Sequence, residues 1–380
     1  MAVAAGDLDT GFGRGGYTVT DIGGWAQEYG MVLQPDGKAV VVGDASAGTV
    51  VARFNADGTL DTGFGEGGRT LTDFTGSRLG MRAVALQPDG KIVTAGGVGG
   101  NAVVARFNTD GSPDTGFGTG GRTTFDFGST DWVNAVAIQP DGKIVTVGGV
   151  QDSTYTAGSV VARFNADGSP DTGFGTGGHT VTGFGVYNGA RAVAIQPDGR
   201  IVTVGYANGG KSALERFNAD GSPDAGFGTG GHTIMDHFGA WVVALQPDGK
   251  IVTAGGDGGH AVARFNADGS PDTGFGTGGR TAVDLGLDNW ARGMAIQPDG
   301  KIITAGFANA SRGSRADTAL VRFNADGSPD TGFGTGGHTV IDLGGAGGDD
   351  AAHAVALQPD GKIITAGHAT GGTALARFCP

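Results

Sequence analysis

The sequence predicts an all-β fold, a seven-bladed β-propeller whose blades are four-stranded antiparallel sheets. Three markers support this fold class, because each of them occurs seven times in the 380 residues. Gln-Pro-Asp-Gly recurs from Gln34 to Gln358 at a mean spacing of about 54 residues. Arg-Phe recurs from Arg53 to Arg377, and Gly-Phe-Gly is the third marker. We therefore expect residues 1–380 to form one propeller domain of seven repeats.

One repeat unit, residues 83–127, shows why each blade has four strands. Its strand-like runs are 83–86, 91–94, 102–107 and 122–126, and Gly, Pro and Asp separate them. Short β-branched runs with this punctuation favour strands, and no window carries a useful apolar period of 3.6 residues. Glycine contributes 79 residues at repeated positions, which indicates turns within a folded chain.

Side-chain size predicts the radial order of the strands. Blades converge at the axis, so the small Ala-Val-Ala-Leu run is expected innermost and the Arg-Phe run farther out. The run that begins at Tyr17, Arg69 or Arg122 then forms the outer edge. Segment 7–21 precedes the first complete unit and should complete the last blade, closing the ring against Arg377-Phe378. The alternative order puts the fourth run innermost and needs no such closure.

Composition limits the partners and the compartment. The net charge of −13 argues against nucleic acid, which requires clustered Lys and Arg. No apolar stretch reaches eighteen residues, so no transmembrane segment is expected. The single Cys379 excludes an intramolecular disulfide and a cysteine-based zinc site, and neither a metal nor a cofactor is predicted. The start MAVAAGDLD fits a cytoplasmic protein or a secreted one whose signal was removed.

The repeat resembles a known family. Ala-Arg-Phe-Asn-Ala-Asp-Gly-Ser-Pro-Asp-Thr-Gly-Phe-Gly-Thr-Gly-Gly, followed by Gln-Pro-Asp-Gly-Lys-Ile-Val-Thr-Ala-Gly-Gly, is similar to the delta-60 repeats of bacterial β-propellers. The layout also resembles that of NHL and WD40 propellers, although the Trp-Asp dipeptide is absent. This resemblance implies the fold and an extracellular or cell-surface location, and it implies no activity or catalytic residue.

The two faces of the predicted ring differ in sequence. The Pro-Asp-Gly turns and the long Asn-Ala-Asp-Gly loops share one face and are nearly identical between units. The connections on the other face vary from unit to unit. A site for one asymmetric ligand cannot consist of residues repeated identically seven times, so we expect it on the variable face.

Aromatic residues gather in the variable connections. All four tryptophans lie in fourth-to-first connections or at their ends, and tyrosines lie beside them. Aromatic rings around a concavity are typical of ligand surfaces. The alternative is that the rings only plug the central opening. The predicted ligand-binding residues are Trp25, Tyr29, Trp132, Tyr187, Trp241 and Trp290.

One position at the entry of the innermost strand changes in every unit. It holds in order Tyr29, Arg82, Asn134, Arg191, Trp241, Arg292 and His353. Three arginines at the mouth of the channel are suited to an anionic or carboxylate ligand. Nearby acids could pair with them or take part in acid–base chemistry. The catalytic candidates are therefore Arg82, Arg191, Arg292 and His353.

Two other motifs are predicted to be structural. The run 165–171 resembles a calcium loop, but its glycine comes one ligand early and no glutamate follows, so a tight turn is favoured. The repeated arginines, including Arg53, are expected to pair with repeated acids such as Asp61, Asp114 and Asp171.

Three functions remain open. The first is a monomeric binding module for a small molecule, glycan or protein on the variable face. The second is an enzyme of lyase or hydrolase type with its active site at the same channel mouth. The third is a purely structural surface repeat.

Overall fold

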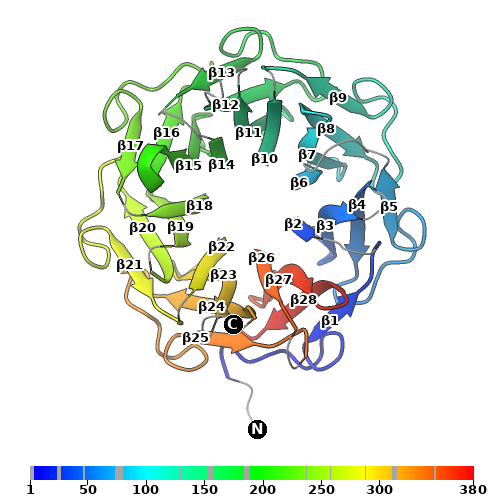
Figure 1. The fold of residues 1–380 in the computed structure, drawn as a ribbon, viewed down its shortest axis with the longest axis vertical. Helices are drawn as coiled ribbons and strands as arrows, with labels where there is room; N and C mark the ends of the chain where they lie inside the picture. The colour runs from blue at the N-terminus through cyan, green and yellow to red at the C-terminus, as the bar shows by residue number, and fades with distance from the viewer. Residues whose placement is uncertain are drawn as a thin grey trace.

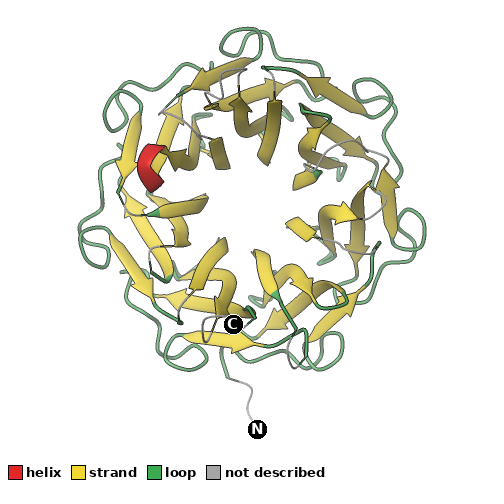
Figure 2. Cartoon of the chain, in the orientation of Figure 1, coloured by secondary structure: helices red, strands yellow, loops and turns green. Residues whose placement is uncertain are grey.

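The computed structural model describes residues 4–23, 27–45, 48–72, 80–128, 130–151, 157–183, 189–236, 238–256, 258–286, 288–309, 315–345 and 348–380. Seven four-stranded antiparallel sheets surround a common axis, and the ring is completed where β1 lies beside β28 (Figure 1). Loops join the strands, and the helical element in the described residues is the 3₁₀ turn Asn208–Gly210 (Figure 2). Among these residues no helix has the length and apolar character to cross a membrane.

The strands form four concentric layers. The innermost strands are β2 (Gln27–Leu33), β6 (Met81–Leu86), β10 (Thr130–Ile138), β14 (Gly189–Ile195), β18 (Gly239–Leu245), β22 (Asp288–Ile296) and β26 (Ala351–Leu357). The second strands are β3 (Ala39–Ala45), β7 (Ile92–Val98), β11 (Ile144–Gln151), β15 (Ile201–Ala207), β19 (Ile251–Gly256), β23 (Ile302–Asn309) and β27 (Ile363–Ala369). The third strands are β4 (Gly48–Phe54), β8 (Asn101–Phe107), β12 (Ala157–Phe164), β16 (Lys211–Phe217), β20 (His260–Phe265), β24 (Asp317–Phe323) and β28 (Gly372–Phe378). The outer strands are β5 (Arg69–Thr72), β9 (Arg122–Phe125), β13 (His179–Thr182), β17 (His232–Met235), β21 (Arg280–Val283), β25 (His338–Ile341) and β1 (Tyr17–Thr20). We number the blades 1 to 7 from β2–β5 onward, so blade 7 contains β26, β27, β28 and β1.

The radial order is the predicted one, with the Ala-Val-Ala-Leu strand next to the axis. The second strands are almost fully buried, as in the buried run of β7. The innermost strands are only half-buried along much of their length, as in β14 and β26. Solvent therefore reaches the axis of the ring, and side chains there can meet a ligand.

The hydrophobic core lies between neighbouring blades. In one cluster Val40 and Val51 of blade 1 pack with Ile92 and Val103 of blade 2, and Phe64 lies between them. Six similar clusters follow around the ring. Since one sheet cannot bury both of its faces alone, each blade is stabilised by its two neighbours.

The N-terminal segment closes the ring as predicted. β1 pairs antiparallel with β28, with Tyr17 opposite Ala376 and Thr20 opposite Thr373. The Arg377 guanidinium donates from Nε to a carboxylate oxygen of Asp9 at 2.8 Å. The two ends of the chain therefore share one blade, and the last sheet keeps four strands.

The face that carries the Pro-Asp-Gly turns and the Asn-Ala-Asp-Gly loops, here called the repeated face, has one Arg–Asp pair in every blade, and blade 3 illustrates it. The Arg163 guanidinium pairs with Asp171 at 2.7 Å and lies over the Phe174 ring, and its NH1 donates to a carbonyl of blade 4. Lys143 donates to the same Asp171 carboxylate at 2.9 Å, and this hydrogen bond is the largest cause that lowers the pKa of Asp171. The predicted pairing of Arg53 with Asp61, and its equivalents, is confirmed. These arginines hold the scaffold together.

The run 165–171 forms the tight turn that the sequence favoured. The Asp167 carboxylate accepts hydrogen bonds from the backbone N–H and the hydroxyl of Ser169, at 2.9 and 2.7 Å. The Phe174 ring that follows is fully buried against Gly221 of the next blade, where a Cβ would lie only 2.9 Å from the ring. Glycine at that position lets the two blades approach closely.

Candidate functional site

Each innermost strand contains a β-bulge near its start, and the bulged residue is the variable position found in the sequence. The pairing register with the second strand shifts across one residue in every blade. Those residues are Tyr29, Arg82, Asn134, Arg191, Trp241, Arg292 and His353. Because a bulge re-aims its side chain, the fold presents one variable residue per blade at the mouth of the axis.

A repeated glycine on the second strand makes room for each bulge. A Cβ at Gly205 would lie 2.2 Å from the carbonyl oxygen of Gly189, and one at Gly96 would lie 2.2 Å from that of Gly80. No side chain can occupy such a space. The glycine of the repeated Thr-Ala-Gly and Thr-Val-Gly runs is therefore the sequence signal for the bulge, which strand patterning alone did not reveal.

The residue after that glycine forms a second variable ring beside the bulged residues. It is Asp44, Gly97, Gly149, Tyr206, Gly256, Phe307 or His368. We use the name axial mouth for these seven residues and the seven bulged ones. The second ring was missed in the sequence, although its signal was a variable position inside an otherwise repeated strand.

An aromatic series crosses blades 4, 5 and 6 at the axial mouth. The Arg191 guanidinium lies 4.2 Å from the Tyr206 ring centre and 3.7 Å from that of Trp241. The Trp241 ring lies 6.2 Å from that of Trp290, which is 42% exposed. Three predicted site residues, Arg191, Trp241 and Trp290, are thus brought together.

Blades 2 and 3 contribute a polar pair to the mouth. Arg82 donates to the side-chain carbonyl of Asn134 at 3.0 Å, and Asn134 donates to the backbone carbonyl of Ala190 at 2.8 Å. Trp132 lies against Gly149, where a Cβ would be 2.1 Å from the indole ring. The glycine of the second ring therefore provides the space that this tryptophan occupies.

Blades 6 and 7 contribute a cation beside two imidazoles. NH1 of Arg292 lies 2.9 Å from Nε2 of His353, and that atom lies 3.0 Å from Nδ1 of His368. Burial, the Arg292 charge and His368 lower the pKa of His353 well below its usual range. His353 is consequently neutral at physiological pH and accepts from Arg292.

The three guanidiniums lie within electrostatic reach of one another. Burial is the main cause that lowers the pKa of Arg191, and the charges of Arg82 and Arg292 lower it further. The axial mouth thus brings three guanidinium groups near one another, and Asp44 is its acidic member.

Three of the predicted ligand-binding residues cannot be placed. Trp25 and Tyr187 lie outside the described residues. The backbone of Tyr29 belongs to β2, but its side chain is outside the description as well. The role of these three residues stays a prediction.

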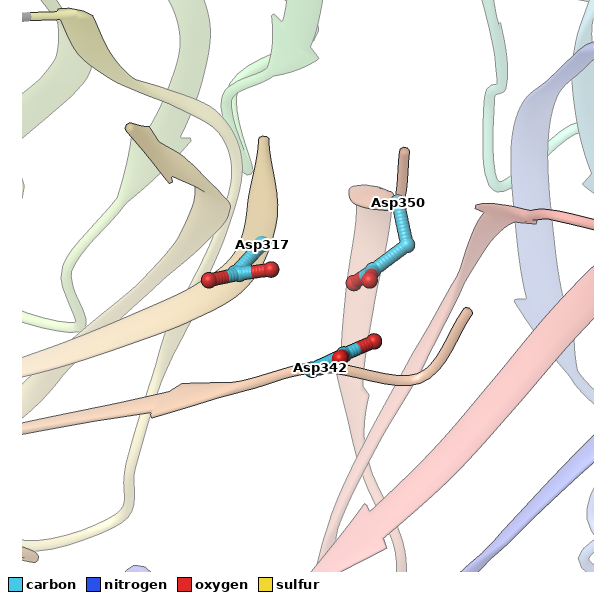
Figure 3. A group of neighbouring side chains, drawn as sticks. All are labelled: Asp317, Asp342 and Asp350. Atoms are coloured by element: carbon cyan, nitrogen blue, oxygen red, sulfur yellow. The ribbon is translucent and has the colours of Figure 1, made fainter. Parts of the chain in front are cut away.

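One group of carboxylates has the spacing of metal ligands within the described part of the chain. Oxygens of Asp317, Asp342 and Asp350 lie within 4.8 Å of one another at the junction of blades 6 and 7, where the side chains converge (Figure 3). Asp350 is fully buried and accepts hydrogen bonds from the backbone N–H groups of Thr318, Leu343 and Gly344. Its role in the described contacts is to anchor the loop that enters β26.

The same junction between other pairs of blades carries different residues. Between blades 5 and 6, Asn289 occupies the place of Asp350 and its amide donates to Asp284 at 3.2 Å. Between blades 4 and 5, Lys211 occupies the place of Asp317 and pairs with Asp236 at 2.6 Å. Burial and the surrounding carboxylates raise the pKa of Asp317. The three versions of this junction therefore differ in the residues that they carry, and the one between blades 6 and 7 has three carboxylates.

The fold and the mouth together define a seven-bladed β-propeller whose variable residues surround the axis. The family described as "Domain of unknown function (DUF5122) beta-propeller" matches residues 34–64, 87–117, 139–174, 196–227, 246–275, 297–333 and 358–379. The chain belongs to this family. No protein of curated function matches the sequence significantly.

Solved structures support the same architecture. Virginiamycin B lyase from Staphylococcus aureus, in complex with quinupristin, has a TM-score of 0.55 at 10% identity, covering 96% of this chain and 100% of that chain. YCF48 from Cyanidioschyzon merolae has a TM-score of 0.52 at 11% identity, covering 96% and 99%. The Dos1 propeller has a TM-score of 0.51 at 10% identity, covering 96% and 81%. At these identities the likeness concerns the fold alone.

Proposed function

We propose that this protein is a binding module for a small anionic molecule, which it holds at the axial mouth. The observation that carries the proposal is the convergence of Arg82, Arg191 and Arg292 from three alternate blades. Guanidinium groups bind carboxylates and phosphates through paired, charge-assisted hydrogen bonds. A ligand with two or three such groups can bridge blades that do not touch each other.

The contacts of Arg191 support a role in binding. The Arg191 guanidinium lies over two aromatic rings, those of Tyr206 and Trp241, which are nearly perpendicular to each other at 77°. In contrast with the scaffold arginines, Arg191 has no ion pair with a described residue. Keeping a cation half-buried without an anion is unfavourable, so an anionic ligand would stabilise this arrangement.

The distribution of variation favours binding over a purely structural role. The Arg–Asp pair of the opposite face recurs in every blade, whereas the pair of residues at the mouth differs in every blade. A structural repeat has no need for five different residue types in seven equivalent bulges. Discrimination of one ligand does require such differences.

The experiment is a calorimetric titration of the full chain with citrate and with benzene-1,3,5-tricarboxylate at low ionic strength. Arg191→Gln should weaken binding at least tenfold and should leave the unfolding midpoint nearly unchanged. Arg200→Gln is the matched control, because it removes the same charge from an exposed residue at the opposite face of the same blade. Absence of binding by both anions, or an equal loss in both variants, would contradict the proposal.

A further inference from the structure

Trp290 differs from every other exposed apolar residue that the structure describes. The large hydrophobic side chains with the highest exposure are Leu71, Val181, Ile234, Trp290 and Val340. Four of them are the third residue of an outer strand, on the rim of the propeller. Trp290 belongs instead to β22, two residues before the bulged Arg292. Within this set, the indole of Trp290 alone lies against residues of the axial mouth, namely Trp241 and Gly256.

The indole of Trp290 lies flat on the backbone of the preceding blade. A Cβ at Gly256 would be 3.1 Å from Cγ and 3.2 Å from both Cδ1 and Cδ2 of Trp290. Three atoms of one ring at the same distance mean that the face of the ring covers the glycine. At the equivalent position, blades 4, 6 and 7 carry Tyr206, Phe307 and His368 in place of glycine. Because blade 5 has a glycine at this position, the ring of Trp290 can lie flat on the backbone there.

The ring of Trp290 is connected to the arginines of the mouth through one neighbouring side chain. Trp290 contacts Trp241, and Trp241 contacts the Arg191 guanidinium. A ring placed on Trp290 is therefore separated from a guanidinium by a single side chain. Arg191 carries the positive charge of this series, and a guanidinium forms its strongest hydrogen bonds with anionic acceptors.

We infer that the ligand of the axial mouth is a planar, conjugated ring that carries two or more carboxylate groups. The ring stacks on Trp290, and the carboxylates accept hydrogen bonds from the arginines. This inference rests on the proposed anion binding and adds the requirement for a flat ring. It assigns Trp290 the role of a specificity-determining residue.

Two probes with the same charges and substitution pattern test the inference. They are benzene-1,3,5-tricarboxylate and its saturated analogue cyclohexane-1,3,5-tricarboxylate, titrated separately into the full chain. The aromatic probe should bind roughly fivefold to tenfold more tightly, since stacking on tryptophan adds attraction that an aliphatic ring lacks. It should also change the tryptophan fluorescence, and the saturated probe should change it less.

Trp290→Leu should reduce the preference for the aromatic probe to less than twofold and leave the affinity for the saturated probe unchanged. Val340→Ala, at an equally exposed apolar residue of the rim, is the control and should keep the full preference. If the two probes bind the wild-type protein equally, the inference is wrong and the anion site stands. If the preference survives in Trp290→Leu, the inference is also wrong. If neither probe binds, both proposals fail.

Discussion

The two faces of this propeller use the same residue type for opposite purposes. Arg163 on the repeated face is nearly buried and pairs with Asp171, and the same pair exists in every blade. Arg191 at the axial mouth is half-buried between aromatic rings, and only alternate blades have an arginine at its position. The comparison teaches that repetition marks scaffold and variation marks the site. The residues that contact an arginine therefore decide whether it supports the scaffold or belongs to the site.

The largest expected effect on stability is at the interface between two blades on the repeated face. Phe174→Ala should lower the free energy of unfolding by about 3–5 kcal/mol, because it leaves a cavity between blades 3 and 4 and removes the surface under Arg163. Urea denaturation measures the loss. The anion affinity of the folded variant should equal that of the wild type. If the folded Phe174→Ala variant lost anion binding, the two faces would not act independently.

The second prediction concerns a buried acid on the third strand of blade 4. Burial raises the pKa of Glu215 from 4.5 to about 7, although hydrogen bonds from Thr182 and Thr203 lower it. The folded protein thus holds this proton more tightly than the unfolded chain, so stability falls as the pH rises from 4.5 to 7. Glu215→Gln should gain roughly 2–3 kcal/mol at pH 8 and almost nothing at pH 4.5.

Urea denaturation at the two pH values measures this difference. Glu66→Gln, at an exposed residue of an outer loop, is the control and should show the wild-type pH profile. Parallel profiles for wild type and Glu215→Gln would show that folding does not raise the pKa of Glu215. Alanine occupies the same position in five of the other blades, at Ala52, Ala105, Ala162, Ala263 and Ala376, which identifies Glu215 as a departure from the repeat.

The third prediction connects the two regions through the bulge. Gly205→Ala would place a Cβ 2.2 Å from the carbonyl of Gly189, so the bulge that presents Arg191 must shift. We expect a loss of about 1–3 kcal/mol in stability together with a weaker anion affinity. Gly183→Ala is the control, because a Cβ there meets nothing within 4 Å and the residue is exposed. Unchanged binding in Gly205→Ala would separate the bulge from the site.

The smallest effect on stability is expected at the axial mouth. Trp290→Ala should lower the free energy of unfolding by about 1 kcal/mol, because the side chain is 42% exposed and packs only against Gly256 and Trp241 among the contacts named above. Thermal unfolding measures it beside Phe174→Ala. A large loss would show that Trp290 plugs the ring, which was the alternative interpretation of the aromatic residues.

Much of the fold could be predicted because its causes are local. The Gln87 turn is closed by a hydrogen bond from Gly90, whose φ of 83° suits glycine, and the same four letters repeat the turn in every blade. The candidate site was predicted less completely. The variable position of Arg191 was found, but its stacking partner Tyr206 belongs to the second variable ring, which was missed in the sequence. Strand patterning does not show that a bulge turns the two side chains together.

By itself the sequence determined the number of blades, the radial order of their strands and the closure of the ring by the N-terminal segment. These follow from repeat counting, side-chain size and turn chemistry, which act over a few residues. Only the tertiary structure decided which side chains meet across blades, such as Arg191 with Trp241 and Trp290 with Gly256. Those contacts depend on how far each bulge turns its side chain and on the angle between neighbouring sheets. Neither quantity is contained in the local pattern of residues.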